Sequence, residues 1–339
     1  MTTENPIVAV LLAGGQGRRL YPASRSDRPK QFFAPDGGRS LLRRTADRAQ
    51  FADAVYAVTP PTYAEAVQNT VPEAGLIVEP AARDTGPALV YAAHRIREQV
   101  GASTLVCMPT DHYVDGEPVP TLERAASIAA EHQRLVTVGI EPERPATGYG
   151  YIEPGATLSN GAAASIQSFH EKPDATTAAR YVDAGYLWNT GIFAWQPSVL
   201  LRAAAESPLS GLVDALGTPD VERAYRGAPA ANIDSVLLED CSSLAVVRAE
   251  FTWDDVGTWD AVGRVYGTEL APSSCRIDSP GTIVASDGPH VSVIGMENTV
   301  VAAYGDHVLV APREESQRVR EIANAVDVDT VETEGLDDR

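Results

Sequence analysis

The stretch Ile7-Val8-Ala9-Val10-Leu11-Leu12-Ala13-Gly14-Gly15-Gln16-Gly17-Arg18-Arg19 begins with six apolar residues and ends in glycines and arginines. A continuous apolar run that ends in glycine is typical of a strand buried on both faces of a parallel sheet. Similar runs follow over residues 54–58, 76–78, 104–108 and 135–140, and segments with helical spacing of apolar residues separate several of them. This alternation predicts an α/β, Rossmann-like three-layer fold with a mostly parallel sheet.

The pattern changes beyond Gly263, where short apolar segments recur every eight or nine residues with Gly, Asp and Asn between them. Such a pattern indicates short-stranded β structure. We therefore expect a large α/β domain over residues 1–265, which the resemblance described below makes the catalytic domain, and a small C-terminal β-rich domain over residues 266–339. A helix is expected near residues 314–325, followed by an acidic tail over 327–339 that frays.

The charge balance is unusual. The 339 residues include 46 Asp and Glu against 27 Lys and Arg, which gives a formal net charge of −19, and only Lys30 and Lys172 are lysines. So acidic a surface repels nucleic acid, and no nucleic-acid partner is expected. We interpret the acidity as halophilic adaptation to molar salt, where screening is strong; the alternative is a genome that spells basic residues as arginine. Each lysine lies in a short motif, Lys30 in residues 29–32 and Lys172 in residues 169–173, and its retention in so lysine-poor a chain predicts a functional role.

The cysteines and the apolar runs indicate where the protein works. Cys107, Cys241 and Cys275 are an odd set without metal-ligand spacing, which suits a reducing compartment. The sequence has no apolar run of about 18 residues and no basic-then-apolar N-terminus. We expect a cytoplasmic protein with no membrane partner.

The glycine-rich segment after the first strand has the features of a phosphate-binding loop. Three glycines let the backbone approach an anion, and the positive side chains of Arg18, Arg19 and Lys30 follow. The segment is not a dinucleotide fingerprint, because Leu20 stands where glycine is needed, and it lacks the Walker spacing. A tight turn without a ligand is the alternative.

Two separated aspartates are candidate metal ligands. Asp111 follows the strand 104–108, and Asp255 lies in the segment Trp253-Asp254-Asp255-Val256-Gly257. Magnesium takes one or two carboxylates and completes its shell with water and substrate phosphates. The alternative is that both are capping residues. His112 is expected to close a turn, and the role of Asp254 is left open.

Several motifs occur together in one order: the glycine loop, then residues 29–32 (PKQF), 79–80 (EP), 83–85 (RDT), 109–112 (PTDH), 147–152 (TGYGYI), 169–173 (FHEKP), 188–193 (WNTGIF) and 253–257 (WDDVG). The series, over residues 7–262, resembles the sugar-nucleotide pyrophosphorylases, a nucleotidyltransferase family. This resemblance implies the family's nucleotidyltransferase fold, and residues 29–32 and 188–193 favour the branch that uses mannose and guanine.

The resemblance implies roles for residues at the matching positions. Catalytic charges would come from Arg19, Lys30 and Lys172. Nucleotide binding would involve Ala13, Gly14, Gly15, Gly17, Arg18, Glu79, Thr85, Gly86 and Asp111. The sugar phosphate would be held by Tyr149, Gly150, Glu171, Lys172 and Asn189. Asp111 and Asp255 would bind Mg²⁺. Arg18 departs from the family's usual threonine. Glu79, Thr85 and Gly86 could read a nucleobase edge or cap a helix.

The implied reaction joins GTP and mannose 1-phosphate, forming GDP-mannose and releasing pyrophosphate. The attacking phosphate oxygen is already anionic, so alignment and charge neutralisation are the tasks of the protein. Two alternatives stay open: the same chemistry with dTTP or UTP and glucose 1-phosphate, or a non-catalytic regulatory paralogue that binds sugar nucleotides. Members of the family often assemble through a C-terminal β-helix, which implies a homodimer.

Overall fold

A computed structural model of the chain describes residues 5–239 and 243–334, without the side chains at position 160 and from 327 onward. The chain forms two compact units. The first unit comprises Met1–Gly14, Thr45–Pro109 and Val114–Trp253, and the second comprises Gly15–Arg44, Thr110–Tyr113 and Asp254–Arg339. The domain boundary at residues 265–266 stays a prediction.

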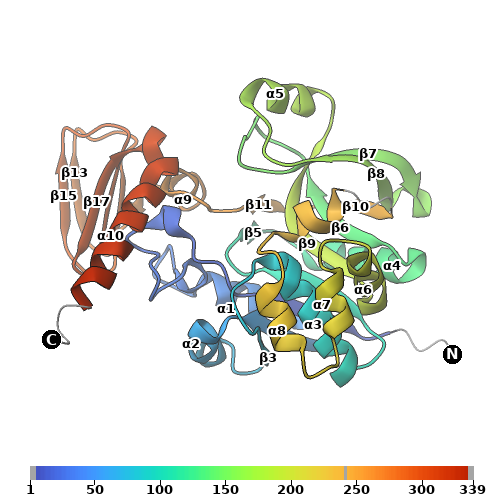
Figure 1. The fold of residues 1–339 in the computed structure, drawn as a ribbon. Coiled ribbons are helices and arrows are strands. Elements are labelled where there is room, and N and C mark those ends of the chain that lie inside the picture. Colours follow the sequence, from blue (N-terminus) through green and yellow to red (C-terminus); the bar gives the residue numbers. More distant parts are fainter. Residues whose placement is uncertain (1–4, 240–242, 335–339) are drawn as a thin grey trace. The chain divides into compact units, whose positions relative to one another are not determined.

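A nine-stranded sheet, of order β3-β2-β1-β4-β9-β6-β10-β8-β7, forms the centre of the first unit (Figure 1). Parallel pairs join β3, β2, β1 and β4, and also β6 with β10, whereas β9 runs antiparallel to β4 and β6. The strands are β1 (Ile7–Leu12), β2 (Ala54–Thr59), β3 (Gly75–Val78), β4 (Thr104–Pro109), β6 (Leu135–Ile140), β7 (Tyr151–Leu158), β8 (Ala163–His170), β9 (Leu187–Trp195) and β10 (Leu244–Arg248).

Strand β1 shows why the apolar runs fold in this way. Val8, Ala9, Val10 and Leu11 are all fully buried. Because successive side chains of a strand point to opposite faces, both faces of the sheet must be covered at β1. This confirms the prediction of an α/β fold with a strand buried on both sides.

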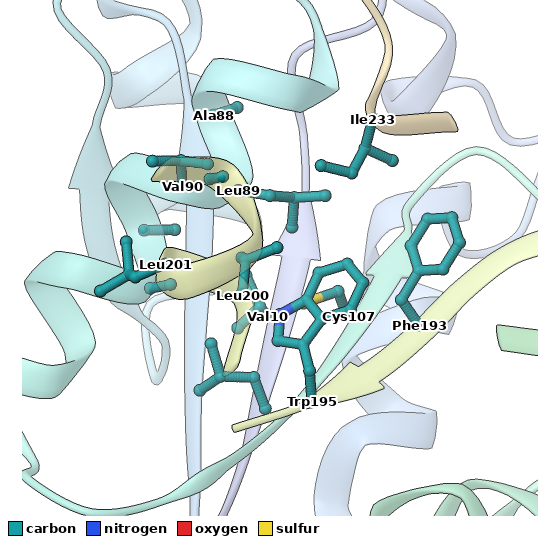
Figure 2. Packing of buried hydrophobic residues seen from close by; sticks show 14 of the residues in the cluster. Val10, Ala88, Leu89, Val90, Cys107, Phe193, Trp195, Leu200, Leu201 and Ile233 are labelled. Carbon is teal, nitrogen blue, oxygen red and sulfur yellow. The ribbon is translucent and has the colours of Figure 1, made fainter. Parts of the chain in front are cut away.

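One face of the sheet carries an apolar cluster in which helix residues pack on the central strands (Figure 2). Val10 and Cys107 of the sheet pack there with Leu89 of α3 (Thr85–Gln99), Leu200 of α6 (Pro197–Ala205) and Trp195 of β9. Burial of one leucine side chain contributes about 1.5–3 kcal/mol. Burial also raises the pKa of the Cys107 thiol far above its usual value, so this cysteine stays protonated in the core.

The helices of the first unit connect these strands, and α4 packs on β4, β6, β9 and β10. They are α2 (Ala64–Thr70), α3 (Thr85–Gln99), α4 (Val119–His132), α5 (Ala175–Asp183), α6 (Pro197–Ala205), α7 (Ser210–Ala215), α8 (Val221–Gly227) and a π-helical turn (Asp234–Leu238). Helix α1 (Leu41–Arg48) and the short strands β5 (Tyr113–Asp115) and β11 (Thr252–Asp254) lie where the chain passes from one unit to the other.

The second unit contains the β-rich C-terminal region. Strands β12, β14 and β16 stack in parallel, β17 pairs antiparallel with β16, and β13 pairs with β15. This confirms the predicted β-rich domain. Its elements are α9 (Trp259–Tyr266), β12 (Glu269–Leu270), β13 (Ser274–Ile277), β14 (Ile283–Ser286), β15 (Val291–Ile294), β16 (Thr299–Tyr304), β17 (His307–Pro312), the 3₁₀ helix Arg313–Arg318 and α10 (Val319–Glu334).

Helix α10 differs from the prediction. It runs to Glu334, so the helix continues through most of the segment expected to fray. Residues 335–339 of the predicted tail lie outside the described residues, as does Cys241. The prediction placed its end near Ala325. Val319 and Ala323 are buried in the apolar core of this unit and anchor the first turns of the helix.

Candidate functional site

In the second unit, the ammonium group of Lys30 joins three segments that are far apart in sequence. Lys30 lies on a 3₁₀ helix (Lys30–Phe32), and its side chain is buried. Its Nζ donates hydrogen bonds to Oδ2 of Asp111 at 3.0 Å and to the backbone oxygen of Asp255 at 2.5 Å. The structure therefore brings together one predicted cation and both predicted metal ligands.

The glycine loop allows this burial because Gly17 leaves room for the lysine stem. Gly17 has a φ of +65°, in the left-handed region that favours glycine. A methyl group there would lie 2.3 Å from Cβ of Lys30. At Gly15, in contrast, an added Cβ would meet no atom within 4 Å. The fold thus needs the third glycine but gives no steric reason for the second.

The charge state of Asp111 follows from its neighbours. Burial would raise the pKa of this carboxyl, but the positive charges of Lys30 and His112 and the hydrogen bond from Lys30 outweigh burial and hold the pKa below its usual value. The side chain is 31% exposed, and Oδ1 lies 3.7 Å from Nε2 of His112. Asp111 is therefore an ionised carboxylate that a ligand can still reach.

The two neighbouring aspartates of the 253–257 segment have different roles. Asp254 is buried, accepts a hydrogen bond from the amide of Val256, and pairs with Arg264 at 2.5 Å. Asp255 accepts from the amide of Gly257 at 3.0 Å, and its backbone oxygen binds Lys30. Asp254 fixes the turn, which answers the question that the sequence left open, and Asp255 presents its carboxylate from that turn.

Arg18 and Arg19 follow Gly17 on a 3₁₀ helix (Arg18–Leu20). Arg18 donates to side-chain oxygens of Gln16 and Asn324, and Arg19 donates to Oε1 of Gln317 at 2.9 Å. Neither Gln317 nor Asn324 stands in any of the sequence motifs. Both come from the C-terminal end of the chain.

In the first unit, the predicted sugar-phosphate residues also converge. The amide of Asn189 donates to the backbone oxygen of Gly150 at 2.8 Å, and the amide of Lys172 donates to that of Tyr149 at 3.2 Å. A Cβ at Gly150 would lie 2.8 Å from Oε2 of Glu171. Glycine at position 150 is therefore required by the close approach of the Glu171 carboxylate.

Lys172 stands in an exposed and strained position. Its side chain is 58% exposed and pairs with Glu171. Its φ is +45°, a left-handed conformation that is rare for lysine and costs on the order of 1–2 kcal/mol. Strain of this kind concentrates at functional sites.

Two tryptophan rings pack against the Tyr149 side chain of this cluster. The Tyr149 ring makes edge contacts with Trp188 at 4.9 Å and Trp253 at 5.2 Å. The Arg144 guanidinium lies 5.1 Å from the Trp188 ring centre and donates to the Tyr149 hydroxyl. Trp188 itself is buried.

Asp234 was missed by sequence reasoning. Its Oδ1 accepts from Nδ2 of Asn189 at 2.9 Å, while Oδ1 of Asn189 accepts from the Thr137 hydroxyl at 2.8 Å. Burial, and next the negative charge of Glu171, raise the pKa of Asp234 to about 7. It sits in a π-helical turn 45 residues from Asn189, and no sequence pattern links the two.

Glu79 is a buried carboxylate at the start of the segment after β3. The Tyr225 hydroxyl donates to its Oε2, and a Cβ at Gly14 would lie 3.4 Å from its Oε1. Burial raises the pKa of Glu79 to about 7, although the hydrogen bond from Tyr225 opposes this rise. Tyr225, like Asp234, could not be found from the motifs.

The other predicted nucleotide-binding residues of the first unit make structural contacts. Ala13 is buried, and its amide donates to Val58 at 2.9 Å. The Thr85 hydroxyl accepts from the amide of Ile233, and a Cβ at Gly86 would lie 2.8 Å from the backbone oxygen of Ala231. Nucleotide binding by Ala13, and contacts of Thr85 and Gly86 with a nucleobase, stay predictions.

Among the described residues, 5–239 and 243–334, no group of three or more His, Cys, Asp or Glu side chains could hold a metal ion. Over the same ranges, no helix has the length and apolar character needed to cross a membrane.

Comparison with known families gives two matches that cover most of the chain. Residues 8–271 match the family model described as nucleotidyl transferase. Residues 273–326 match the model described as mannoseP isomerase/GMP-like beta-helix domain.

Individual relatives agree with these matches. The chain is 32% identical to a mannose-1-phosphate guanylyltransferase of Sinorhizobium fredii, over 95% of this chain and 68% of the relative. It is also 32% identical to the xanthan biosynthesis protein XanB of Xanthomonas campestris, over 94% and 73%. A crystal structure described as mannose-1-phosphate geranyltransferase from Thermus thermophilus superposes with a TM-score of 0.87 at 32% identity, over 95% of this chain and 99% of that one.

Proposed function

The chain belongs to the nucleotidyl transferase family, and from this premise we propose that it transfers GMP from GTP to α-D-mannose 1-phosphate. The products are GDP-mannose and pyrophosphate. The observation that carries the proposal is the Lys30 ammonium group, which binds the Asp111 carboxylate and the Asp255 backbone. A buried cation that is paired with one carboxylate and lies next to a glycine loop suits the binding of a triphosphate. The relatives named as guanylyltransferases support the choice of substrates.

The reaction needs no protein nucleophile. An oxygen of the mannose 1-phosphate attacks the α-phosphorus of GTP, the bond from that phosphorus to the bridging oxygen breaks, and the electron pair leaves with pyrophosphate. Because both reactants are anions, the protein must offset their repulsion. We assign Arg19 and Lys30 to the nucleotide phosphates and Lys172 to the sugar phosphate. Gly14, Gly15, Gly17 and Arg18 would line the phosphate loop.

Mg²⁺ is the cofactor that this account requires, and Asp111 and Asp255 would hold it. The donors fit, because both are hard oxygen ligands and Asp111 is partly exposed while its lowered pKa keeps it ionised. When bound, the ion would neutralise charge on the phosphates.

Guanine is the base that best suits Glu79. In its ionised form the Glu79 carboxylate only accepts hydrogen bonds, and guanine offers adjacent N1–H and N2–H donors that would favour this form over the neutral acid. The N3–H of uracil or thymine lies between two acceptor oxygens, which a carboxylate would repel. Tyr225 holds Oε2 of Glu79, so Oε1 is the oxygen assigned to the base.

The sugar side is assigned to the cluster around Asn189. The Glu171 carboxylate and the Asn189 amide would bind sugar hydroxyls, and the Tyr149–Gly150 backbone would shape the wall of the site. The strained, exposed Lys172 would exchange its ion pair with Glu171 for one with the incoming phosphate, since a phosphate carries more charge than a carboxylate.

The test is pyrophosphate release at high KCl with Mg²⁺, in which four nucleoside triphosphates are crossed with mannose, glucose and fucose 1-phosphates. Release only with GTP and mannose 1-phosphate is expected. Release with another pair would replace the substrates but keep the chemistry, and no release with any pair would overturn the enzymatic proposal in favour of a binding role. Asp255→Asn should abolish Mg²⁺-dependent turnover while the melting temperature is retained.

We also propose a homodimer formed through the β-rich region. Ile294 is 71% exposed, and Val308 and Val310 are exposed on strand β17. An apolar strand at the edge of a sheet favours pairing with another chain. Light scattering should give the mass of two chains, and a monomer at micromolar concentration would contradict this proposal.

The acidic composition leads to a proposal about the solvent. We propose that the protein works in a salt-rich cytoplasm, because a net charge of −19 destabilises a compact state unless it is screened. The melting temperature should rise steeply between dilute buffer and molar KCl. Equal stability in both would favour genome composition as the cause.

A further inference from the structure

The C-terminal end of the chain packs against the 3₁₀ helix that carries Arg18 and Arg19. Leu20 of that helix is fully buried in one apolar cluster with Val319 and Ala323 of α10. Val319 and Ala323 are four residues apart and therefore lie on one face of the helix. This packing places polar side chains of the same segment beside the two arginines.

Two amide side chains of this segment accept hydrogen bonds from the arginines. Oε1 of Gln317 accepts from Nη1 of Arg19 at 2.9 Å, and Oδ1 of Asn324 accepts from Nη1 of Arg18 at 2.6 Å. Gln317 and Asn324 are both exposed, so packing in the core does not account for these residue types at these positions. The contacts join residues 298 and 306 positions apart in the chain.

The chemical type of these acceptors is informative. The chain has 46 acidic residues, and the same segment carries Glu315 and Glu321, which pair with Arg318. Arg19 is instead held here by the neutral amide of Gln317. An amide orients a guanidinium without cancelling its charge, whereas a carboxylate would compete with a phosphate for it.

Arg19 is also guided on its other side. Its Nη2 lies 3.0 Å from the position that a Cβ of Gly257 would take, so glycine at position 257 leaves room for the guanidinium. Gly257 also donates to the Asp255 carboxylate. The hydrogen bond to Gln317 therefore holds Arg19 beside the Asp255 turn, where Gly257 leaves room for its guanidinium group.

We propose that Gln317 is a positioning residue, which aims the Arg19 guanidinium group at the triphosphate and leaves its charge available to it. The C-terminal segment thereby takes part in nucleotide binding in addition to its place in the β-rich region. This inference rests on the proposed function, because it assumes that Arg19 contacts the nucleotide phosphates.

The test compares Gln317→Ala and Gln317→Glu with the wild-type protein and with Glu314→Gln, an exposed control in the same 3₁₀ helix. The KM for GTP should rise about tenfold in Gln317→Ala, while the KM for mannose 1-phosphate and the melting temperature stay unchanged. Gln317→Glu should retain the melting temperature but also lose GTP affinity, because its carboxylate pairs with Arg19. The control should match the wild type.

A purely structural hydrogen bond gives a different pattern. In that case glutamate, which also accepts from arginine, would restore both stability and the KM for GTP. That result, or KM values for GTP within twofold of the wild type in both variants, would overturn the inference. If the wild-type protein releases no pyrophosphate, the proposed function fails separately, and the GTP affinities of the same variants, measured by calorimetry, still decide the role of Gln317.

Discussion

The surroundings of the two lysines differ in almost every physical respect. Lys30 is 4% exposed and is bound by the Asp111 carboxylate and the Asp255 backbone. Lys172 has a side chain that is 58% exposed, pairs with the adjacent Glu171, and has a left-handed backbone. One ammonium group is part of the folded structure of its unit, and the other projects from a strained turn.

This difference indicates two ways of using one positive charge. A buried, multiply bonded lysine is a fixed charge, which suits a phosphate group that stays in place. An exposed lysine on a flexible stem can follow a phosphate that moves as the new bond forms. Substitutions that separate stability from turnover can test whether the two lysines differ in this way.

The largest effect is expected for Lys30→Met, compared with Lys172→Met. Removing one partner of a buried charge pair costs about 3–5 kcal/mol, because the other charge is left without compensation; the partial exposure of Asp111 places the expected loss near the lower end. Lys172→Met should change the free energy of unfolding by less than about 0.5 kcal/mol, as is usual for exposed positions. Chemical denaturation measures both, and equal stability losses would remove the contrast.

Gly17→Ala tests whether Lys30 depends on the glycine loop. The new methyl group would overlap Cβ of Lys30 and require a left-handed alanine, so a stability loss of about 3 kcal/mol is expected. Gly15→Ala is the matched control, because its methyl group meets no atom within 4 Å. It should melt like the wild type and yet bind GTP more weakly. A stable, fully active Gly17→Ala protein would refute this account of the loop.

The pKa of Glu79 should shift in the opposite direction to that of Asp111, because Glu79 is buried but is not paired with Lys30. Burial raises the pKa of Glu79 to about 7, above its ordinary value near 4.5. The folded state therefore binds this proton more tightly, and the contribution to stability is complete below pH 4.5 and lost as pH rises through 7. The loss is on the order of 3 kcal/mol, since one pKa unit corresponds to about 1.4 kcal/mol.

Two variants isolate this titration. In Glu79→Gln the fall in stability between pH 5 and 8 should become shallower. In Tyr225→Phe, which removes the hydrogen bond that lowers the pKa of Glu79, the pKa should move above 7. NMR titration of the Glu79 carboxyl measures the shift directly, and a pKa near 4.5 in the wild-type protein would contradict the structure.

Lys172→Arg should have the smallest effect and the most specific one. A planar guanidinium on the strained turn should cost about 2 kcal/mol in kcat/KM, the scale of a hydrogen bond to a charged group. The melting temperature should not change. Turnover close to that of the wild type would show that position 172 needs only a positive charge.

Much of the fold could be predicted because its signals are local. The apolar runs of β1, β2, β4 and β6 each consist of neighbouring residues, so they can be recognised in the sequence without knowledge of the fold. The length of α10 could not be predicted in this way, because its anchor is burial against Leu20, about 300 positions earlier in the chain.

The residues of the candidate site also fall into those that local motifs predict and those that only the tertiary fold reveals. The motifs identified Lys30, Asp111 and Asp255, and the structure brings them together. Asp234, Tyr225, Gln317 and Asn324 were missed, since each meets its partner only through the tertiary fold and none belongs to a recognisable motif. Hydrogen bonds between distant side chains leave no periodic trace in one sequence.

The most direct test of the central claim follows phosphorus atoms through the reaction by ³¹P NMR. The wild-type protein would be supplied with GTP, mannose 1-phosphate and Mg²⁺ at high KCl. The account predicts that the α-phosphorus of GTP appears in a sugar-linked diphosphate, while the β- and γ-phosphorus atoms leave together as pyrophosphate. Transfer of the γ-phosphorus, or release of inorganic phosphate without a sugar nucleotide, would contradict it.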